Sequence, residues 1–166
     1  MIPASRQRSY LQSALSVAIA GILAALLLER LLTYAEAVEK AKVEVTLSRL
    51  HSGLYAQLAL HALKGERNAV EGMRTRSPFA VLEWRLPEYL GEFDGVPSGA
   101  DDGRWLFDRT RSELVYVPRL TRHLQTASAA RPSVLRFRVD LTRGAAGGYS
   151  GVVLVPVEPF RWEPFS

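Results

Sequence analysis

The chain of 166 residues contains no cysteine, and only three of its 21 basic residues are lysine, namely Lys40, Lys42 and Lys64. The absence of cysteine excludes disulfides, cysteine-ligated zinc, iron–sulfur clusters and a thiol nucleophile. The remaining basic residues are arginines, and the formal net charge is +4. Because the arginines are scattered among acidic residues and form no run, we expect no nucleic-acid partner.

Sequence motifs of the common enzyme classes are also missing. The chain has no G-x-S-x-G nucleophile motif, no phosphate-binding loop, no dinucleotide fingerprint and no H-E-x-x-H zinc motif. Acidic residues are present, but no pattern marks a cleft in which a pair of them would act as acid and base. We therefore expect a protein that is not an enzyme, with a membrane-tethered enzyme as the least favoured alternative.

Charge is absent from residues 10–28, and most of this stretch is Ala, Leu, Ile and Val. A helix of about 20 such residues crosses the hydrocarbon core of a bilayer and satisfies all its backbone hydrogen bonds internally. We predict a transmembrane half-helix over residues 10–30. Arg6 and Arg8 precede it, so the positive-inside rule places residues 1–9 in the cytoplasm and the C-terminal part outside it.

A cleaved signal peptide is the main alternative to this anchor. Ala35, Glu36 and Ala37 form an A-x-A cleavage pattern after the apolar stretch, with basic residues ahead of it. However, Glu29 and Arg30 separate the apolar stretch from this pattern, and the intervening spacing is helical. The retained helix is therefore the preferred interpretation.

Proline is absent from residues 4–77, and apolar residues recur at helical spacings well beyond the membrane segment. We predict an extramembrane half of the same helix over residues 31–64, ending at Gly65. Glu39, Glu44 and Arg49 are expected on its exposed surface. At about 1.5 Å per residue, the whole helix would be roughly 80 Å long, so its outer half needs a protein partner.

Short segments with alternating apolar and polar residues follow. Residues 104–108 and 114–117 predict a hairpin, residues 135–141 predict the clearest strand, and residues 152–157 predict a fourth. The chain thus predicts an α+β fold, in which the long N-terminal helix packs on a small antiparallel sheet of about four strands. Residues 65–166 form the head, with a connector that contains short helices near 68–73 and 78–83. The aromatic tail, with Phe160, Trp162 and Phe165, is too apolar to extend freely into solvent.

Four stretches carry a resemblance to a known family: residues 77–82 (SPFAVL), 87–91 (PEYLG), 103–108 (GRWLFD) and 113–118 (ELVYVP). With the helix ahead of them, they resemble the connector and first hairpin of type IV pilin-like proteins, which include minor pilins and the pseudopilins of type II secretion. The resemblance implies an inner-membrane subunit with a periplasmic head, which acts by assembling with other pilin-like or secretion-system subunits.

This chain departs from the family at the prepilin-peptidase motif. The family has a Gly followed by Phe and an acid at the fifth mature position, ahead of the apolar helix. Here Gly21 lies inside the apolar stretch, is followed by Ile22, and has its nearest following acid at Glu29. A second interpretation therefore stays open, namely a bitopic envelope protein whose periplasmic domain binds a ligand or senses the cell wall.

Metal binding has few candidates. Asp94, Asp101 and Asp102 lie among glycines in one loop, and carboxylates on a flexible loop suit calcium, although their spacing fits no defined calcium loop. We expect no cofactor, with calcium at these aspartates as the alternative. His51 and His61 are ten residues apart, which does not place them on one helix face, so we expect these and His123 to be structural or exposed.

Overall fold

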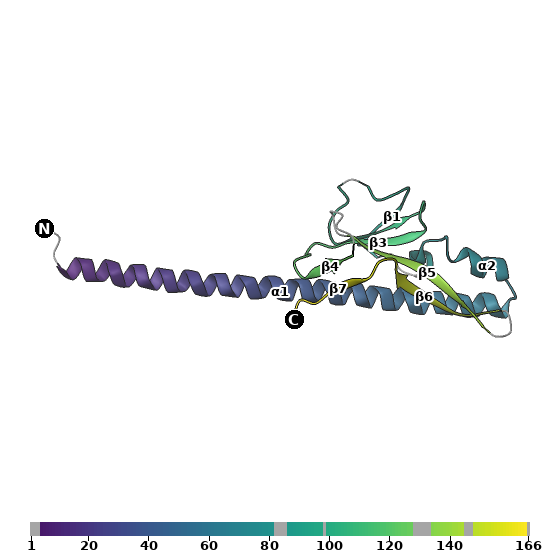
Figure 1. Ribbon diagram of the computed structural model, residues 1–166, viewed down its shortest axis with the longest axis horizontal. Helices are drawn as coiled ribbons and strands as arrows, with labels where there is room; N and C mark the ends of the chain where they lie inside the picture. Colours follow the sequence, from purple (N-terminus) through teal and green to yellow (C-terminus); the bar gives the residue numbers. More distant parts are fainter. Residues whose placement is uncertain (1–3, 82–85, 98, 128–133, 145–147, 166) are drawn as a thin grey trace.

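The computed structural model describes residues 4–81, 86–97, 99–127, 134–144 and 148–165 (Figure 1). Its largest element is a single helix, α1 (Ala4–Leu63), of 60 residues. The helix continues without a break through residues 28–40, and Gly65 follows its end with a φ of 70°, in the left-handed conformation that glycine tolerates best. The predicted long helix and its stop are confirmed.

Two short helices and seven strands follow α1. The helices are α2 (Arg67–Gly72) and a 3-10 helix, η1 (Pro78–Val81). The predicted short helices are thus present, although residues 82 and 83 of the second lie outside the described residues. The strands are β1 (Tyr89–Phe93), β2 (Arg104–Asp108), β3 (Glu113–Val117), β4 (Leu124–Thr126), β5 (Leu135–Arg143), β6 (Tyr149–Pro156) and β7 (Phe160–Trp162).

The main sheet has five strands in the order β1-β2-β3-β5-β6, and β4 pairs with β7 in a separate two-stranded sheet. All pairings are antiparallel except that of β1 with β2, which is parallel. The α+β architecture agrees with the prediction, but the count of about four strands was too low. The sequence did not reveal β1, β4 and β7. β4 and β7 have only three residues each, too few to establish an alternating pattern, and β1 has a central glycine, which weakens a strand pattern.

The outer half of α1 packs on one face of this sheet. Between residues 13 and 35 of the helix no side chain is buried, whereas Val43, Leu50, Leu54 and Leu58 further along are at most 4% exposed. The sheet and tail contribute the facing apolar side chains, which include Trp105, Tyr116, Phe137, Val139, Leu141, Val152 and Trp162. The core therefore begins abruptly, just beyond the segment predicted to lie in the membrane.

The opposite face of the main sheet is also covered. Leu106, Val115 and Val117 are at most 2% exposed and pack against Phe93, at the end of β1, and Val96, in the segment that joins β1 to β2. This explains why β2 and β3 are almost continuously buried instead of alternating. The head is consequently a three-layer arrangement of helix, sheet and covering loop.

The helix–sheet contact predicts a large difference between two identical substitutions on α1. Leu50→Ala is expected to lower the free energy of unfolding by about 2–5 kcal/mol, because it leaves a cavity in the core. Leu60→Ala is the matched control, since Leu60 is 44% exposed. Guanidinium unfolding of the detergent-solubilised full chain, followed by tryptophan fluorescence, measures both. Equal losses would contradict the packing of α1 on the sheet.

Candidate functional site

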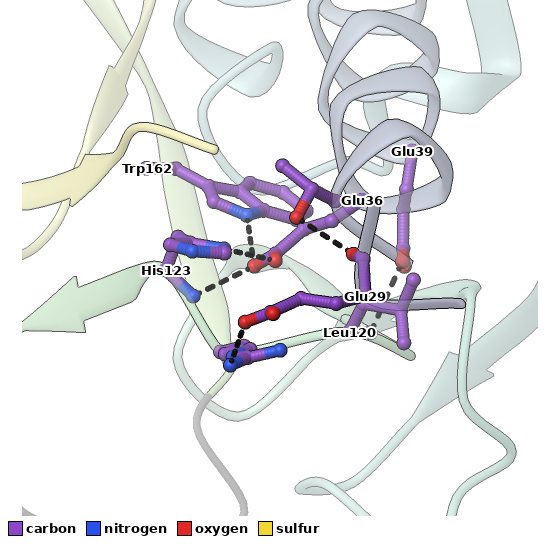
Figure 2. A network of polar contacts seen from close by, with 8 residues as sticks. Glu29, Glu36, Glu39, Leu120, His123 and Trp162 are labelled. Carbon is purple, nitrogen blue, oxygen red and sulfur yellow. Dashed lines mark hydrogen bonds and ion pairs between the residues drawn. The ribbon is translucent and has the colours of Figure 1, made fainter. Parts of the chain in front are cut away.

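Three glutamates of α1 meet the end of the head that lies nearer the N-terminus of the helix, and we call Glu29, Glu36 and Glu39 the glutamate cluster (Figure 2). They are spaced by seven and three residues, so they lie on one side of a helix with 3.6 residues per turn. Their partners are in β3, in the segment that joins β3 to β4 and in β7, far away in sequence. The cluster therefore joins the helix to these separate parts of the head.

Glu36 is the most buried member, with 1% of its surface exposed. Its Oε1 accepts hydrogen bonds from the backbone N–H of His123 at 2.9 Å and from the indole Nε1–H of Trp162 at 2.9 Å. Its Oε2 lies 2.6 Å from Nδ1 of His123. Because an ionised carboxylate only accepts hydrogen bonds, Nδ1 carries the proton in this contact.

Two opposing effects act on the acidity of Glu36. Burial, the largest single effect, raises the pKa of its carboxyl, but the hydrogen bonds from His123 and Trp162 together lower the pKa below its usual value. The carboxyl is thus ionised at neutral pH despite its burial. Its negative charge is stabilised by donors and not by exposure to water.

Glu39 binds the start of the same connecting segment. Its Oε1 accepts hydrogen bonds from the hydroxyl of Tyr116 at 2.8 Å and the backbone N–H of Arg119 at 2.7 Å, and its Oε2 accepts one from the N–H of Leu120 at 3.1 Å. Burial and the neighbouring Glu39 raise the pKa of Tyr116, so its hydroxyl keeps the proton that it donates.

Glu29 completes the cluster on the side of the apolar stretch. Its Oε1 forms an ion pair with Nη2 of Arg122 at 3.0 Å, and both side chains are more than half exposed. An exposed pair contributes little to stability, at most about 1 kcal/mol. The pair matters for position, because it places Arg122, from the segment between β3 and β4, beside the end of the apolar stretch of α1.

Glu36 and Glu39 were missed as functional residues by sequence reasoning. The sequence predicted that Glu39 would be on the exposed surface of the helix, and the structure corrects this, since only 9% of Glu39 is exposed. Glu36 drew notice only as part of an A-x-A pattern. One signal was available: Glu36, Val43 and Leu50 follow at intervals of seven, which places Glu36 on the apolar face of the helix.

The histidines lie in three separate places. His51 Nε2 is 2.9 Å from the carbonyl oxygen of Val152, and His61 Nδ1 is 2.7 Å from Oε2 of Glu66. Only His123 contacts the glutamate cluster. His51 and His61 thus have different partners, one in β6 and one just beyond the end of α1.

The proposed calcium ligands are not gathered into a site. Both carboxylate oxygens of Asp94 accept hydrogen bonds from the guanidinium of Arg109, each at 3.0 Å. The side chains of Asp101 and Asp102 are exposed. In the part of the chain that the structure describes, no group of three or more His, Asp or Glu residues is placed to hold a metal ion.

A groove of about 790 Å³ lies beside the cluster, between α1 and the β2–β3 hairpin. Val38, Lys42 and Val45 line its helix side, and Trp105 and Tyr116 line its sheet side. Within the described residues, every buried side-chain nitrogen and oxygen atom, those of Glu36 and Glu39 included, has a hydrogen-bond partner. The arrangement is suited to holding the helix and the head together.

No family model, no curated protein and no solved structure matches this chain. The resemblance to pilin-like proteins accordingly depends on the four stretches quoted above and on the layout of helix and sheet.

Neutralising Glu36 is expected to destabilise the protein and to reduce its sensitivity to acid. Glu36→Gln removes the charge that His123 and Trp162 stabilise, which costs about 1–3 kcal/mol at neutral pH. In the wild type the folded-state pKa is lowered, so the contribution of Glu36 is present above the ordinary value of 4.5 and is lost as the pH falls through the folded pKa. Glu36→Gln has no ionisable group at this position, so it lacks the part of the acid-induced loss of stability that comes from Glu36.

Unfolding free energies measured between pH 7 and pH 3 test this expectation. Glu44→Gln is the control, because the side chain of Glu44 is 62% exposed on the same helix. Parallel pH profiles for the wild type and Glu36→Gln would contradict the assigned role of Glu36.

Proposed function

We propose that this protein is a non-enzymatic, single-pass membrane subunit of a bacterial type IV pilus or type II secretion machine, and that it acts by assembling with other pilin-like or secretion-system subunits. The anchor is in the inner membrane, the N-terminus is cytoplasmic and the head is periplasmic. The observation that carries the proposal is an apolar stripe on α1 that stays uncovered outside the membrane segment.

The stripe consists of Val38, Ala41 and Val45. Spacings of three and four residues place them on one helix face, and all three are exposed, Val38 by 55% and Val45 by 50%. They lie about 15–25 Å beyond Leu28 along the helix, which is further than the headgroup layer extends. Lipid therefore does not reach them. This exposed apolar stripe supports a contact with another protein.

Retention of the membrane segment has separate support. Residues 13–63 contain a window that is long and apolar enough to cross a membrane, and no residue of that window is buried in the head. A signal sequence meets the same criteria. However, a cut after Ala37 would remove Glu36, and the buried indole N–H of Trp162 would lose its acceptor. Removal of this acceptor is costly, which favours an uncut chain.

The intact mass of the protein extracted from native membranes tests retention. We expect the mass of the full chain, 18.4 kDa. A product that lacks the first 37 residues would establish the signal-peptide alternative and would overturn the anchor.

The alternative function is a bitopic envelope protein with a ligand-binding or sensing head. The groove between α1 and the β2–β3 hairpin favours it, because its walls are mostly apolar and it is large enough for a small molecule. The stripe of Val38, Ala41 and Val45 forms part of the helix wall of this groove, so a neighbouring subunit and a small ligand compete as its occupants.

Site-directed cross-linking distinguishes the two functions. The chain has no native cysteine, so Val45→Cys carries the single reactive thiol. We expect cross-links from position 45 to another envelope subunit in native membranes. Glu44→Cys is the matched control, since consecutive helix residues point about 100° apart. Equal cross-linking at both positions, or none at position 45, would contradict assembly through the stripe.

A further inference from the structure

The C-terminal tail ends beside the helix, at the end of the head that faces the membrane segment (Figure 1). There the ring of Phe165 packs edge-on against the ring of Tyr34, with centroids 5.4 Å apart and an interplanar angle of 61°. Both rings are nonetheless open to solvent, Phe165 by 64% and Tyr34 by 59%. Two large rings in contact form an uncovered patch that neither ring would form alone.

The tail is fixed in this position by the residues that precede Phe165. β7 pairs with β4, and Trp162 is 3% exposed and donates its indole hydrogen bond to Glu36. Pro164, next to Phe165, is also buried. The exposure of Phe165 is thus imposed by a docked backbone and is not that of a loose chain end.

The position of the patch along α1 follows from the length of the membrane segment. Tyr34 is six residues beyond Leu28, the last residue of the uncharged stretch, which is about 9 Å along the helix. The polar headgroup layer adds about 5–8 Å to each side of the hydrocarbon core. Helix side chains point back toward the N-terminus, so the Tyr34 ring reaches down into this layer.

The ion pair between Glu29 and Arg122 independently supports the position of this end of the head close to the membrane segment. It brings the segment between β3 and β4 to within one residue of the uncharged stretch. No spacer separates the head from the membrane segment. If residues 10–28 span the bilayer, this end of the head is at the membrane surface.

We propose that Leu31, Tyr34 and Phe165 form an interfacial patch that lies in the headgroup layer and holds the head against the membrane. The inference deepens the proposed function and depends on its membrane anchor. Leu31 shares the helix face of Tyr34 and is 55% exposed. Aromatic and leucine side chains are the residues that favour the membrane–water interface. The three side chains of the patch carry no charge, so the attraction of the patch itself is apolar.

Spin labelling of single cysteines tests the depth of the patch. Full-length chains carrying Phe165→Cys, Leu23→Cys or Leu63→Cys are labelled with a nitroxide and reconstituted at low density in phosphatidylcholine vesicles. Leu23 marks the hydrocarbon core, and Leu63, which is 88% exposed at the far end of α1, marks water. Collision rates with oxygen and with a water-soluble nickel chelate give the depth of each label.

We expect a nickel collision rate at position 165 that is several-fold lower than at position 63, with an oxygen rate between those of positions 23 and 63. A label at Tyr34→Cys is expected at the same depth. This variant keeps Phe165, so its result does not depend on whether the C-terminal tail tolerates a label. High nickel access at position 34 or 165, with position 23 in the hydrocarbon, would overturn the patch alone. Shielding from both reagents would show a protein contact and would overturn it too. Water exposure of position 23 would overturn the anchor itself.

Discussion

The buried carboxylate of Glu36 is the contact on which the arrangement of helix and head depends. An ionised carboxylate removed from water is costly unless hydrogen-bond donors replace the water. Its donors come from His123 and Trp162, which belong to different segments of the head. Glu36 is therefore satisfied only when both segments lie on α1 together. One side chain thus couples the helix, the β3–β4 connection and the C-terminal tail.

Polar and apolar contacts have different roles along the helix. Leu50, Leu54 and Leu58 supply apolar burial, which is nearly indifferent to small rotations of the helix. The hydrogen bonds of Glu36 and Glu39 require defined distances and directions, so they fix one rotation of α1 relative to the sheet. That rotation determines which face of the helix points outward. The uncovered stripe at Val38, Ala41 and Val45 is a consequence of the same contacts.

The helix and the long strands were predictable from sequence because their signals are local. The absence of proline and the helical spacing of apolar residues predicted α1, and strict alternation predicted β5. β4 and β7 are three residues long, so their pairing depends on the tertiary structure and not on a pattern. The role of Glu36 was hidden for a similar reason, since His123 and Trp162 are 87 and 126 residues away. The spacing of Glu36 with Val43 and Leu50 indicated the apolar helix face, but its hydrogen-bond donors could not be inferred from any local pattern.

The glutamate cluster also determines how the anchor and the head move relative to one another. Contacts with the head begin at Glu29 and continue through Glu36 and Glu39 along an unbroken helix, so no hinge lies between residue 28 and the head. A helix anchored in a bilayer is tilted and rotated by its neighbours. Because α1 is continuous with the packed core, such a tilt would move the head as one body. A partner bound at Val38 and Val45 would therefore orient the head and the membrane segment together.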